Sequence, residues 1–498
     1  MRPLRILFVA AEMAPLVKVG GLGDVAGALP SALAERGHDV RVLMPAYSER
    51  MVGNAREHLR LPGDAGRLLE YDRDSVPVPL WLLETPGFLR RGGQPYLNRA
   101  GRPWADNALQ FGRLGRAAAL LAAGADPDWI PDIVHCNDWH TGLAPVYMHL
   151  DGTRTASMLT IHNLAYTGCF DPDIMPRLKL PVRLYRTDAL EFHGDISFLK
   201  GGLVHATRLT TVSPGYAREI LTPEQGAGMD GILRDRSEHL TGILNGLDYR
   251  HWDPANDGHL RHRFDARDLA GKRKERMLVE RDLGLESDDA RSTPLLVWIG
   301  RLAHQKGADL LLEALPRLMQ QNVRLAILGS GDRDHERALM RAARKWPDRI
   351  SVTTDFNETL AHRLYAAGDM LLMPSRFEPC GLAQLCAMRY GNIPIVTRVG
   401  GLADTVTDVG EARIDKATGF FMRETTAEAL VAAVTRATGV FREGRIWPRL
   451  MANAMRCRYD WSHSAESYER VYRSALPAER VNGQRPVVSE RQRAGGTA

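Results

Sequence analysis

The sequence has few cysteines, and they are not arranged in pairs. Of its 498 residues five are cysteine, at Cys136, Cys169, Cys380, Cys386 and Cys457. An odd number without CxxC spacing excludes a disulfide framework and a cysteine zinc site. We therefore expect a reducing compartment, and the cytoplasm is the simplest one.

Long apolar runs are also missing. A membrane span needs about 18 consecutive apolar residues, and no stretch reaches that length. The run Ile6–Ala11 follows two arginines and so imitates a signal peptide, but it is too short and ends at Glu12. We predict a soluble cytoplasmic protein with no membrane partner.

Neither sign of charge dominates the chain. It has 65 basic and 60 acidic residues, which gives a formal net charge of +5. This excess is spread over a long chain, so nucleic acid is not an expected partner. With 44% hydrophobic and 25% charged residues, the composition is that of a globular protein of two or three domains.

Three catalytic motifs do not occur. A GxSxG turn, an HExxH helix and a GxxxxGK[ST] loop are all absent, which argues against the hydrolase, metalloprotease and P-loop classes.

Short apolar runs alternate with segments of helical period, which predicts parallel βαβ units and an α/β fold. Two series of strands indicate two doubly wound domains with a boundary near Gly246. The strands predicted in the first series are Arg5–Ala10, Asp39–Pro45, Ile133–Cys136, Ala156–Ile161 and Leu209–Ser213. Those in the second are Leu295–Ile299, Arg324–Leu328, Ile350–Thr353, Met370–Met373 and Pro394–Thr397. Helices are predicted at Ala108–Ala123 and Ser462–Ser474.

A glycine loop with a lysine follows the first predicted strand. Lys18 precedes Gly20, Gly21 and Gly23, and Asp24 opens a helical pattern. Glycines let backbone N–H groups approach an anion, and a helix N-terminus adds partial positive charge, so phosphate is a natural ligand. A tight turn beside a surface lysine fits the same residues equally well.

Cations follow the first strand of the second series. Arg301 and Lys306 lie at its carboxyl end, the edge where open α/β sheets bind ligands. They could hold a diphosphate and neutralise the charge that builds on it as a leaving group. The glycine loop Gly329–Asp332 follows the next strand of the same sheet in the same way, but by itself it is weak evidence for a ligand site. Further along, Glu378 precedes a predicted helix and could accept hydrogen bonds from sugar hydroxyls or simply cap that helix.

Two polar clusters follow strands of the first series. One is His135–His140, which includes Asp138, and the other is Ile161–Tyr166, which includes His162 and Asn163. Neither offers a third ligand at zinc spacing. A single histidine is more often structural, but two clusters on one sheet edge favour substrate contact.

Five segments read together resemble bacterial glycogen synthase and the plant starch synthases. They occur in order along nearly the whole chain, from about residue 4 to about residue 475. The segments are Lys18–Leu22, Asn137–His140, Thr160–Leu164, Ile243–Asp248 and Glu378–Leu382.

The resemblance implies a GT-B fold, in which two doubly wound Rossmann-like domains face each other across a deep cleft. It divides the chain into an N-terminal domain on the acceptor side, a C-terminal donor domain, a helix that crosses back, and a tail that we expect to be disordered. The corresponding ranges are 1–245, 246–461, 462–476 and 477–498.

The resemblance also implies the reaction: transfer of glucose from ADP-glucose to the non-reducing 4-OH of an α-1,4-glucan such as glycogen. The α configuration is retained, and neither a metal nor pyridoxal phosphate is required. The implied catalytic residues are His162, Arg301, Lys306, Glu378 and Asp138. The implied donor-binding residues are Lys18, Gly20, Gly21, Asp24, Asn163, Asn245, Cys380 and Gly381.

The sequence departs from related enzymes at two positions. Val19 stands where the family loop usually has Thr, so a hydroxyl is lost. If that hydroxyl contacts the donor phosphate, a hydrogen bond of about 0.5–1.5 kcal/mol is missing; if it only supports the loop, affinity changes little. Cys386 replaces the second Glu of an E-x7-E pattern, which the glycogen synthase group commonly lacks.

Other functions remain open on sequence chemistry alone. The same fold can use UDP-glucose or a smaller acceptor, because phosphate-binding motifs do not select the base. A phosphorolytic relative would need a lysine-bound pyridoxal phosphate. A catalytically silent glucan- or nucleotide-binding protein is an alternative of another class.

Overall fold

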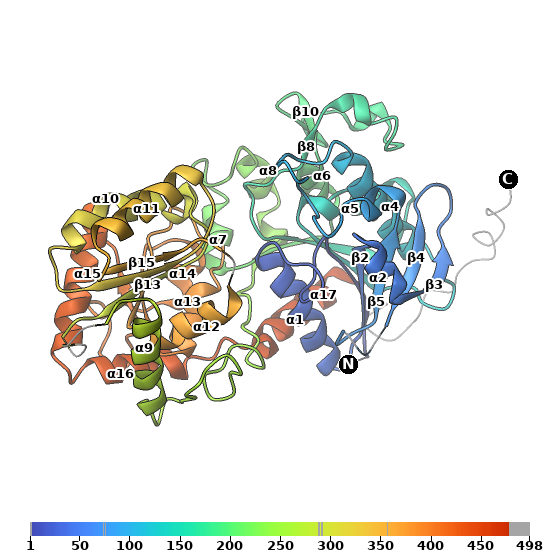
Figure 1. The fold of residues 1–498 in the computed structure, drawn as a ribbon. Coiled ribbons are helices and arrows are strands. Elements are labelled where there is room, and N and C mark those ends of the chain that lie inside the picture. Colours follow the sequence, from blue (N-terminus) through green and yellow to red (C-terminus); the bar gives the residue numbers. More distant parts are fainter. Residues whose placement is uncertain are drawn as a thin grey trace. The chain divides into compact units, whose positions relative to one another are not determined.

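The computed structural model describes residues 2–477 except 73, 75, 287, 288, 290, 291 and 356. The residues from 478 onward, which include nearly all of the tail expected to be disordered, lie outside the described part. The chain divides into two compact units: unit 1 holds 1–211, 220–243 and 462–498, and unit 2 holds 212–219 and 244–461. Each is described by itself below (Figure 1).

Unit 1 is built on one sheet of nine strands in the order β12-β11-β7-β6-β1-β2-β5-β4-β3. The neighbouring pairs from β12 to β5 are parallel, as expected for βαβ units. The strands are β1 Arg5–Val9, β2 Asp39–Pro45, β3 Ala55–Arg60, β4 Arg67–Tyr71, β5 Leu80–Glu84, β6 Ile133–Asn137, β7 Ala156–Ile161, β11 Arg208–Thr211 and β12 Leu240–Gly242.

Three strands at one side of this sheet were not predicted. β4 pairs antiparallel with both β3 and β5. β3 is mostly exposed and rich in charge, and Arg67 holds it through an ion pair with Glu57 at 2.8 Å. β3 therefore carries no apolar run that the sequence pattern could reveal, whereas β4 and β5 are mostly buried and were missed despite their apolar residues. The small antiparallel sheet of β8 Cys169–Phe170, β10 Asp195–Ser197 and β9 Glu191–Phe192 was missed because its strands are only two or three residues long.

The helices of unit 1 connect these strands. They are α1 Gly21–Glu35, α2 Glu49–Gly53, α3 Pro86–Leu89, α4 Asn107–Ala122, α5 Leu143–Leu150, α6 Phe198–His205, α8 Asp230–Asp235 and α17 Trp461–Ala475. The predicted helix at Ala108–Ala123 corresponds to α4, whose alanines and leucines are almost all buried.

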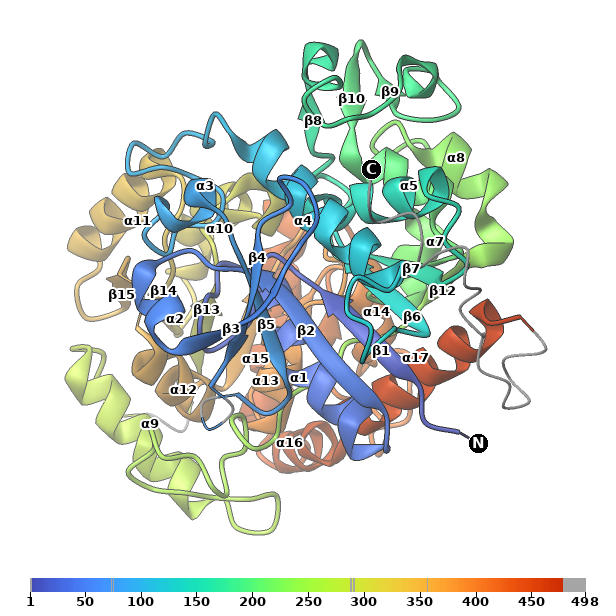
Figure 2. The same cartoon turned by 90° about the vertical axis from the view of Figure 1, so that its right-hand side faces the viewer.

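The last helix packs on the first sheet although it follows unit 2 in the sequence. The Tyr472 hydroxyl in α17 lies 2.8 Å from His135 Nδ1 in β6, and both side chains are fully buried. Glu469 accepts hydrogen bonds from Arg36, next to the end of α1. Figure 2 shows α17 beside β1 in unit 1.

Unit 2 has a parallel sheet of six strands in the order β15-β14-β13-β16-β17-β18. Numbered from its own first strand this is 3-2-1-4-5-6, the order of a Rossmann fold. The strands are β13 Leu295–Ile299, β14 Arg324–Leu328, β15 Ile350–Thr353, β16 Met370–Met373, β17 Ile393–Val396 and β18 Phe420–Phe421. The helices are α7 Pro214–Glu219, α9 Ala270–Asp282, α10 Ala308–Leu318, α11 Arg333–Lys345, α12 Glu358–Ala367, α13 Ala383–Arg389, α14 Gly400–Thr405, α15 Ala427–Arg442 and α16 Trp447–Arg456.

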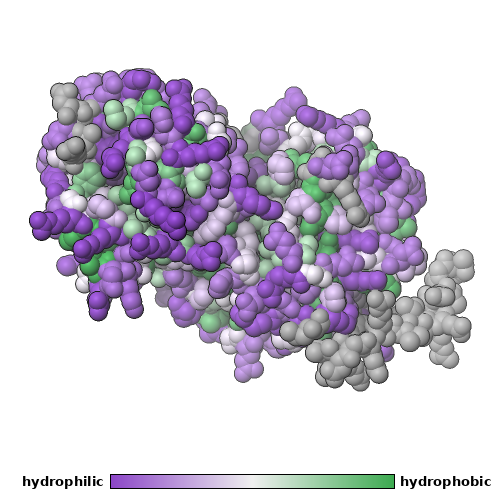
Figure 3. Space-filling view, turned by 90° about the horizontal axis from the view of Figure 1, so that it is seen from below, coloured by the Kyte–Doolittle hydropathy of each residue, from purple (hydrophilic) through white to green (hydrophobic). Residues whose placement is uncertain are grey.

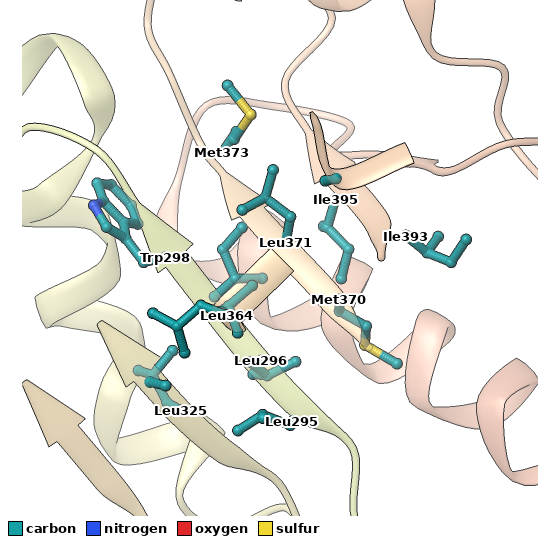
Figure 4. Close-up of a cluster of buried hydrophobic side chains, with 14 of the residues drawn as sticks. Leu295, Leu296, Trp298, Leu325, Leu364, Met370, Leu371, Met373, Ile393 and Ile395 are labelled. Atoms are coloured by element: carbon teal, nitrogen blue, oxygen red, sulfur yellow. The ribbon is translucent and has the colours of Figure 1, made fainter. Parts of the chain in front are cut away.

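The core of unit 2 lies on both faces of this sheet. Leu295 and Leu296 are fully buried in β13, and Leu371 in β16 packs in the same cluster as Leu364 from α12 (Figure 4). Because strands buried on both faces read as continuous apolar runs, the sequence predicted β13, β14 and β16 with the observed bounds. The bounds of β15, which is only partly buried, were also predicted.

One segment corrects the expected boundary of the first domain at residue 245. Residues 212–219, with α7, belong to unit 2. Three hydrogen bonds explain this: Ser213 Oγ donates to the Pro379 carbonyl at 2.6 Å, Gly215 N to Asp404 at 2.5 Å, and Gly400 N to Glu219 at 2.6 Å.

Among the described residues, no helix combines the length and the apolar character needed to cross a bilayer. On the face drawn in Figure 3, polar side chains predominate and apolar ones appear in small groups between them.

Candidate active site

The polar segments of unit 1 meet at one edge of its sheet. β1 pairs in parallel with β6, and β6 with β7. Parallel neighbours end at the same edge, so the loops that follow these three strands lie side by side. This is the edge where open α/β sheets bind ligands.

The glycine loop leads into α1 as predicted. Gly20 is the N-cap of α1, and no side chain caps the helix. A Cβ on Gly20 would meet nothing within 4 Å, whereas one on Gly23 would lie 3.1 Å from Glu12 Oε2. Gly20 therefore leaves open space at the helix start, while Gly23 allows close packing. Lys18 Nζ lies 2.7 Å from Asp24 Oδ1, and both side chains are partly exposed.

Glu12 holds this loop, a role that the sequence analysis missed. Its carboxylate accepts hydrogen bonds from Val19 N at 2.5 Å, Gly20 N at 3.1 Å and the Tyr96 hydroxyl at 2.9 Å. Burial raises the pKa of Glu12. The available signal was a carboxylate directly after a buried strand. The side chain of Val19 is itself 57% exposed, so the loop is supported through its backbone.

Asp138 lies buried at the end of β6 with a positive φ of 55°. Such a backbone is unusual for a residue other than glycine and is often found at functional sites. Asp138 Oδ1 accepts a hydrogen bond from His162 N at 2.7 Å, and the backbone N–H of Asn163 also bonds to this side chain. Burial nevertheless raises the pKa of Asp138 to about 7.

Neighbouring hydrogen bonds fix the tautomer of His162. Its Nε2 lies 2.9 Å from Asn137 Oδ1, and Asn137 Nδ2 donates to the Val9 carbonyl. The Asn137 oxygen must then accept from Nε2–H, which leaves the Nδ1 lone pair of His162 as an acceptor. Burial lowers the pKa of His162 to about 3, so the ring is neutral near pH 7.

The other two histidines of these clusters are structural. His135 is bonded to Tyr472 and to Thr160 Oγ1 and is fully buried. His140 stacks on Tyr96, with ring centroids 4.6 Å apart.

In unit 2 the cationic loop follows β13. Lys306 Nζ donates to Glu378 Oε2, and Ser375 Oγ donates to the same oxygen at 3.2 Å. Glu378 is 5% exposed. Arg301 is exposed and lies 3.2 Å from Gln305 Oε1. Because β13 pairs in parallel with β16, the loops that carry these cations and Glu378 meet at one edge.

Backbone constraints explain the shape of the cationic loop. Gly307 has a φ of +77°, and a Cβ there would lie 2.2 Å from the Pro374 carbonyl oxygen. Arg376 fixes the same region through Asp309, with bonds of 2.8 and 2.7 Å, and through the His304 carbonyl at 2.7 Å.

The third glycine loop packs against the cationic loop. A Cβ on Gly329 would lie 1.9 Å from the Gly300 oxygen, and one on Gly331 2.5 Å from the Leu302 oxygen. The N-terminus of α11 is capped by Asp332, whose carboxylate accepts from Asp334 N and His335 N. The free backbone N–H groups at the start of α11 therefore already donate to a carboxylate.

Asn245, Cys380 and Gly381 lie together in unit 2. The backbone N–H of Asn245 is bonded to the Cys380 side chain, whose pKa burial raises to about 12. That value makes Cys380 a neutral thiol and a poor nucleophile. Asn245 is 5% exposed, and no partner for its Oδ1 is described. A buried acceptor without a donor favours a ligand there. Gly381 has a φ of +71°, which suits glycine.

The predicted site residues thus fall into two sets. The unit 1 set is Lys18, Gly20, Gly21, Asp24, Asp138, His162 and Asn163, and the unit 2 set is Asn245, Arg301, Lys306, Glu378, Cys380 and Gly381. Each set lies on the loops of its own unit, apart from Gly21 and Asp24 in the first turn of α1, and the roles of the individual residues stay predictions.

Two families match the chain. Residues 5–235 match the starch synthase catalytic domain family, and residues 293–438 match the family of glycosyl transferases group 1. With two Rossmann-like units, these matches define a glycosyltransferase of the GT-B fold.

Individual relatives are more specific. The chain is 44% identical to glycogen synthase 2 of Nitrosococcus oceani, covering 95% of this chain and 98% of the relative, and 47% identical to glycogen synthase of Alkalilimnicola ehrlichii, covering 95% and 99%. The solved catalytic domain of starch synthase IV from Arabidopsis thaliana, bound to ADP and acarbose, matches with a TM-score of 0.84 and 32% identity, covering 95% and 99%. The chain belongs to the glycogen synthase family.

Proposed function

We propose that the chain transfers glucose from ADP-glucose to the non-reducing 4-OH of an α-1,4-glucan. The glycogen synthases that cover nearly its whole length support this reaction, as does the related starch synthase IV domain bound to ADP and acarbose.

The observation that carries the proposal is the ion pair of Lys306 with the buried carboxylate of Glu378 at the carboxyl edge of β13 and β16. Arg301 lies on the same loop. Departure of ADP leaves negative charge on its terminal phosphate, and fixed cations at that edge stabilise this charge. Glu378 can accept hydrogen bonds from glucose hydroxyls while it orients Lys306.

Unit 1 supplies the polar groups for the sugar. A neutral His162 offers Nδ1 to a hydroxyl. Asp138 is positioned by the backbone of His162, and its carboxylate form stabilises positive charge as the glucosyl ring approaches an oxocarbenium ion. We assign this role to the ionised form because the protonated acid provides no such charge.

Retention proceeds in this proposal by a front-face route. The C1–O bond to ADP breaks, the C1–O4 bond to the acceptor forms on the same face, and the acceptor proton passes to the departing phosphate. Such a route needs no covalent intermediate, metal ion or pyridoxal phosphate, and the cations Arg301 and Lys306 supply the charge that a metal would otherwise provide. The trapping of a glucosyl-enzyme adduct would overturn it.

The decisive experiment compares donors. Purified enzyme with a glycogen primer is given ADP-glucose or UDP-glucose, and glucose incorporation and nucleotide diphosphate release are both measured. Incorporation from ADP-glucose alone supports the proposal. Preference for UDP-glucose overturns the donor, release without incorporation overturns the acceptor, and ADP binding without turnover indicates a silent binding protein.

Two controls test the remaining parts of the proposal. Full activity in EDTA and no pyridoxal absorbance are expected if no cofactor takes part. A cytoplasmic location, which the lack of disulfides between the described cysteines favours, is checked by fractionation of cells that express the protein.

A further inference from the structure

A cluster of histidines and carboxylates lies in unit 2, and none of its members is among the predicted site residues. His251 and Glu358 are exposed, and His362 is buried. One possible ligand atom from each of the three lies within 4.8 Å of the others. His251 comes from the chain after β12, whereas Glu358 and His362 lie one turn apart on α12.

His362 is oriented for an interaction that the described residues do not supply. Its Nδ1 lies 2.8 Å from Asp257 Oδ2, to which the Tyr390 hydroxyl also donates at 2.6 Å. The other Asp257 oxygen, Oδ1, accepts from His259 N at 2.8 Å. Asp257 is therefore the acceptor in each of these contacts and takes Nδ1–H of His362, which leaves the lone pair of His362 on Nε2.

That nitrogen is buried and has no hydrogen-bond partner among the described residues. The ring cannot easily turn to find one. Trp252 stacks on one part of it, with centroids 3.9 Å apart and an interplanar angle of 5°, and His259 packs at 4.3 Å. A buried acceptor without a donor is costly, so an unpaired Nε2 points to a ligand.

The other two groups can move to complete a site. His251 Nε2 lies 3.1 Å from Glu358 Oε1, and their side chains are 47% and 45% exposed. A metal between them requires small adjustments, which exposed side chains make readily. Asn357 caps α12 by accepting from Leu360 N at 2.8 Å, so the turn that carries Glu358 is itself well fixed.

We propose that His251, Glu358 and His362 bind a divalent transition metal ion of the zinc class. Two imidazoles and one carboxylate, with a fourth position open to solvent, are typical ligands for Zn²⁺ and unsuitable for Mg²⁺ or Ca²⁺, which prefer oxygen. Asp257 acts as the carboxylate that orients a metal-bound histidine.

A second combination of groups is less suitable. Asp257, His259 and His362 also bring ligand atoms within 4.8 Å. Both Asp257 oxygens, however, already accept hydrogen bonds: Oδ2 from His362 and Tyr390, and Oδ1 from His259 N at 2.8 Å. His259 Nδ1 is likewise 3.0 Å from Thr359 Oγ1. This set therefore has fewer free ligand atoms than the first.

The test measures binding directly. Untagged chain is freed of metal with a chelator and titrated with Zn²⁺ by calorimetry, and Co²⁺ absorption reports the ligand geometry. We expect one equivalent per chain and an increase in melting temperature on Zn²⁺ addition.

Two exposed substitutions identify the ligands. His251→Gln and Glu358→Gln should each weaken Zn²⁺ binding by at least about tenfold and leave the melting temperature without metal unchanged. The control is His463→Gln, an exposed histidine on α17, which should bind as the parent does. Absence of stoichiometric binding, or equal binding by all four proteins, would overturn the site. Neither result depends on glucosyl transfer, so the proposed function is tested separately.

Discussion

At the scale of single residues, the buried carboxyl groups of the two sets differ in whether a cation pairs with them. In unit 2, Lys306 and Glu378 neutralise each other, and this ion pair is 23% and 7% exposed at its side chains. In unit 1, Asp138 has no such cation among its described hydrogen bonds, and burial raises its pKa to about 7. Removing a charge should therefore affect stability differently at the two places.

Lys306→Ala should lower kcat by about 10²–10³-fold, because a cation that stabilises the leaving phosphate is lost. It should also lower stability, because Ser375 is then the one side-chain partner of Glu378 among the described residues. Steady-state kinetics and urea unfolding measure the two effects.

A double variant separates these effects. Lys306→Ala with Glu378→Gln removes both charges, so stability should largely return while activity stays low. Lys416→Ala, at an exposed lysine of the same unit, is the control. An active double variant would contradict the role of Lys306.

Asp138→Asn should stabilise the folded enzyme above pH 7. A carboxyl whose folded pKa is raised from 3.8 to about 7 contributes stability that is complete below pH 4 and lost as pH rises through 7. Asn does not titrate, so the variant does not lose this stability. Its free energy of unfolding should exceed that of the parent increasingly between pH 4 and 8, by up to about 1–3 kcal/mol. Asn also tolerates a positive φ.

Urea unfolding at several pH values measures the effect, with the exposed Asp128→Asn as the control. Activity should fall in Asp138→Asn even though stability rises. A constant difference between parent and variant across pH would show that Asp138 does not titrate as the structure indicates.

At the scale of elements, the start of α1 is positioned by close contact with the preceding loop. A Cβ on Gly27 would lie 2.8 Å from the carbonyl oxygen of Ala14, which is backbone and cannot move aside cheaply. The Ala14 N–H also donates a hydrogen bond to the Gly23 carbonyl in α1 at 3.0 Å. The loop that carries Lys18 is thus fixed against the helix that it precedes.

Gly27→Ala should therefore displace the Lys18 loop, raise the KM for ADP-glucose severalfold and lower the melting temperature. Gly439→Ala is the matched control, because this glycine also lies inside a helix, α15, and a Cβ there meets nothing within 4 Å. The control should gain slight stability from higher helix propensity. Equal kinetics for both variants would exclude a positioning role for Gly27.

The sequence could predict those elements whose signal is local. β7, β13, β14 and β16 were predicted with the observed bounds because each is a mostly apolar run. β2 and β15 were also predicted with their observed bounds, whereas β5, which carries a similar run, was missed. β3 was missed because it is mostly exposed and has few apolar residues, and Glu12 because its partners Val19, Gly20 and Tyr96 are brought to it only by folding. His251 and His362 are separated by more than a hundred positions, so no spacing rule could join them.

At the scale of the whole molecule, the chain returns to unit 1 for its last helix. The chain leaves unit 2 at Trp461 and adds α17 to the first sheet. Tyr468 and Tyr472 are fully buried there, and Tyr472 is bonded to His135 in β6. The first sheet therefore depends on residues that are synthesised after all of unit 2.

Tyr472→Ala should destabilise unit 1 by about 3–5 kcal/mol, the usual cost of deleting a buried aromatic ring. Tyr472→Phe should cost only about 1 kcal/mol, because it removes the hydroxyl bonded to His135 Nδ1 and keeps the ring. The partly exposed Ser467→Ala on the same helix is the control. Urea unfolding followed by tryptophan fluorescence measures all three, since Trp81 and Trp129 are buried in unit 1. If Tyr472→Ala unfolds like the control, α17 contributes little to the stability of unit 1. If unit 1 unfolds at lower urea while unit 2 stays folded, α17 completes the fold of unit 1. The enzyme then becomes active only once synthesis of α17 is finished.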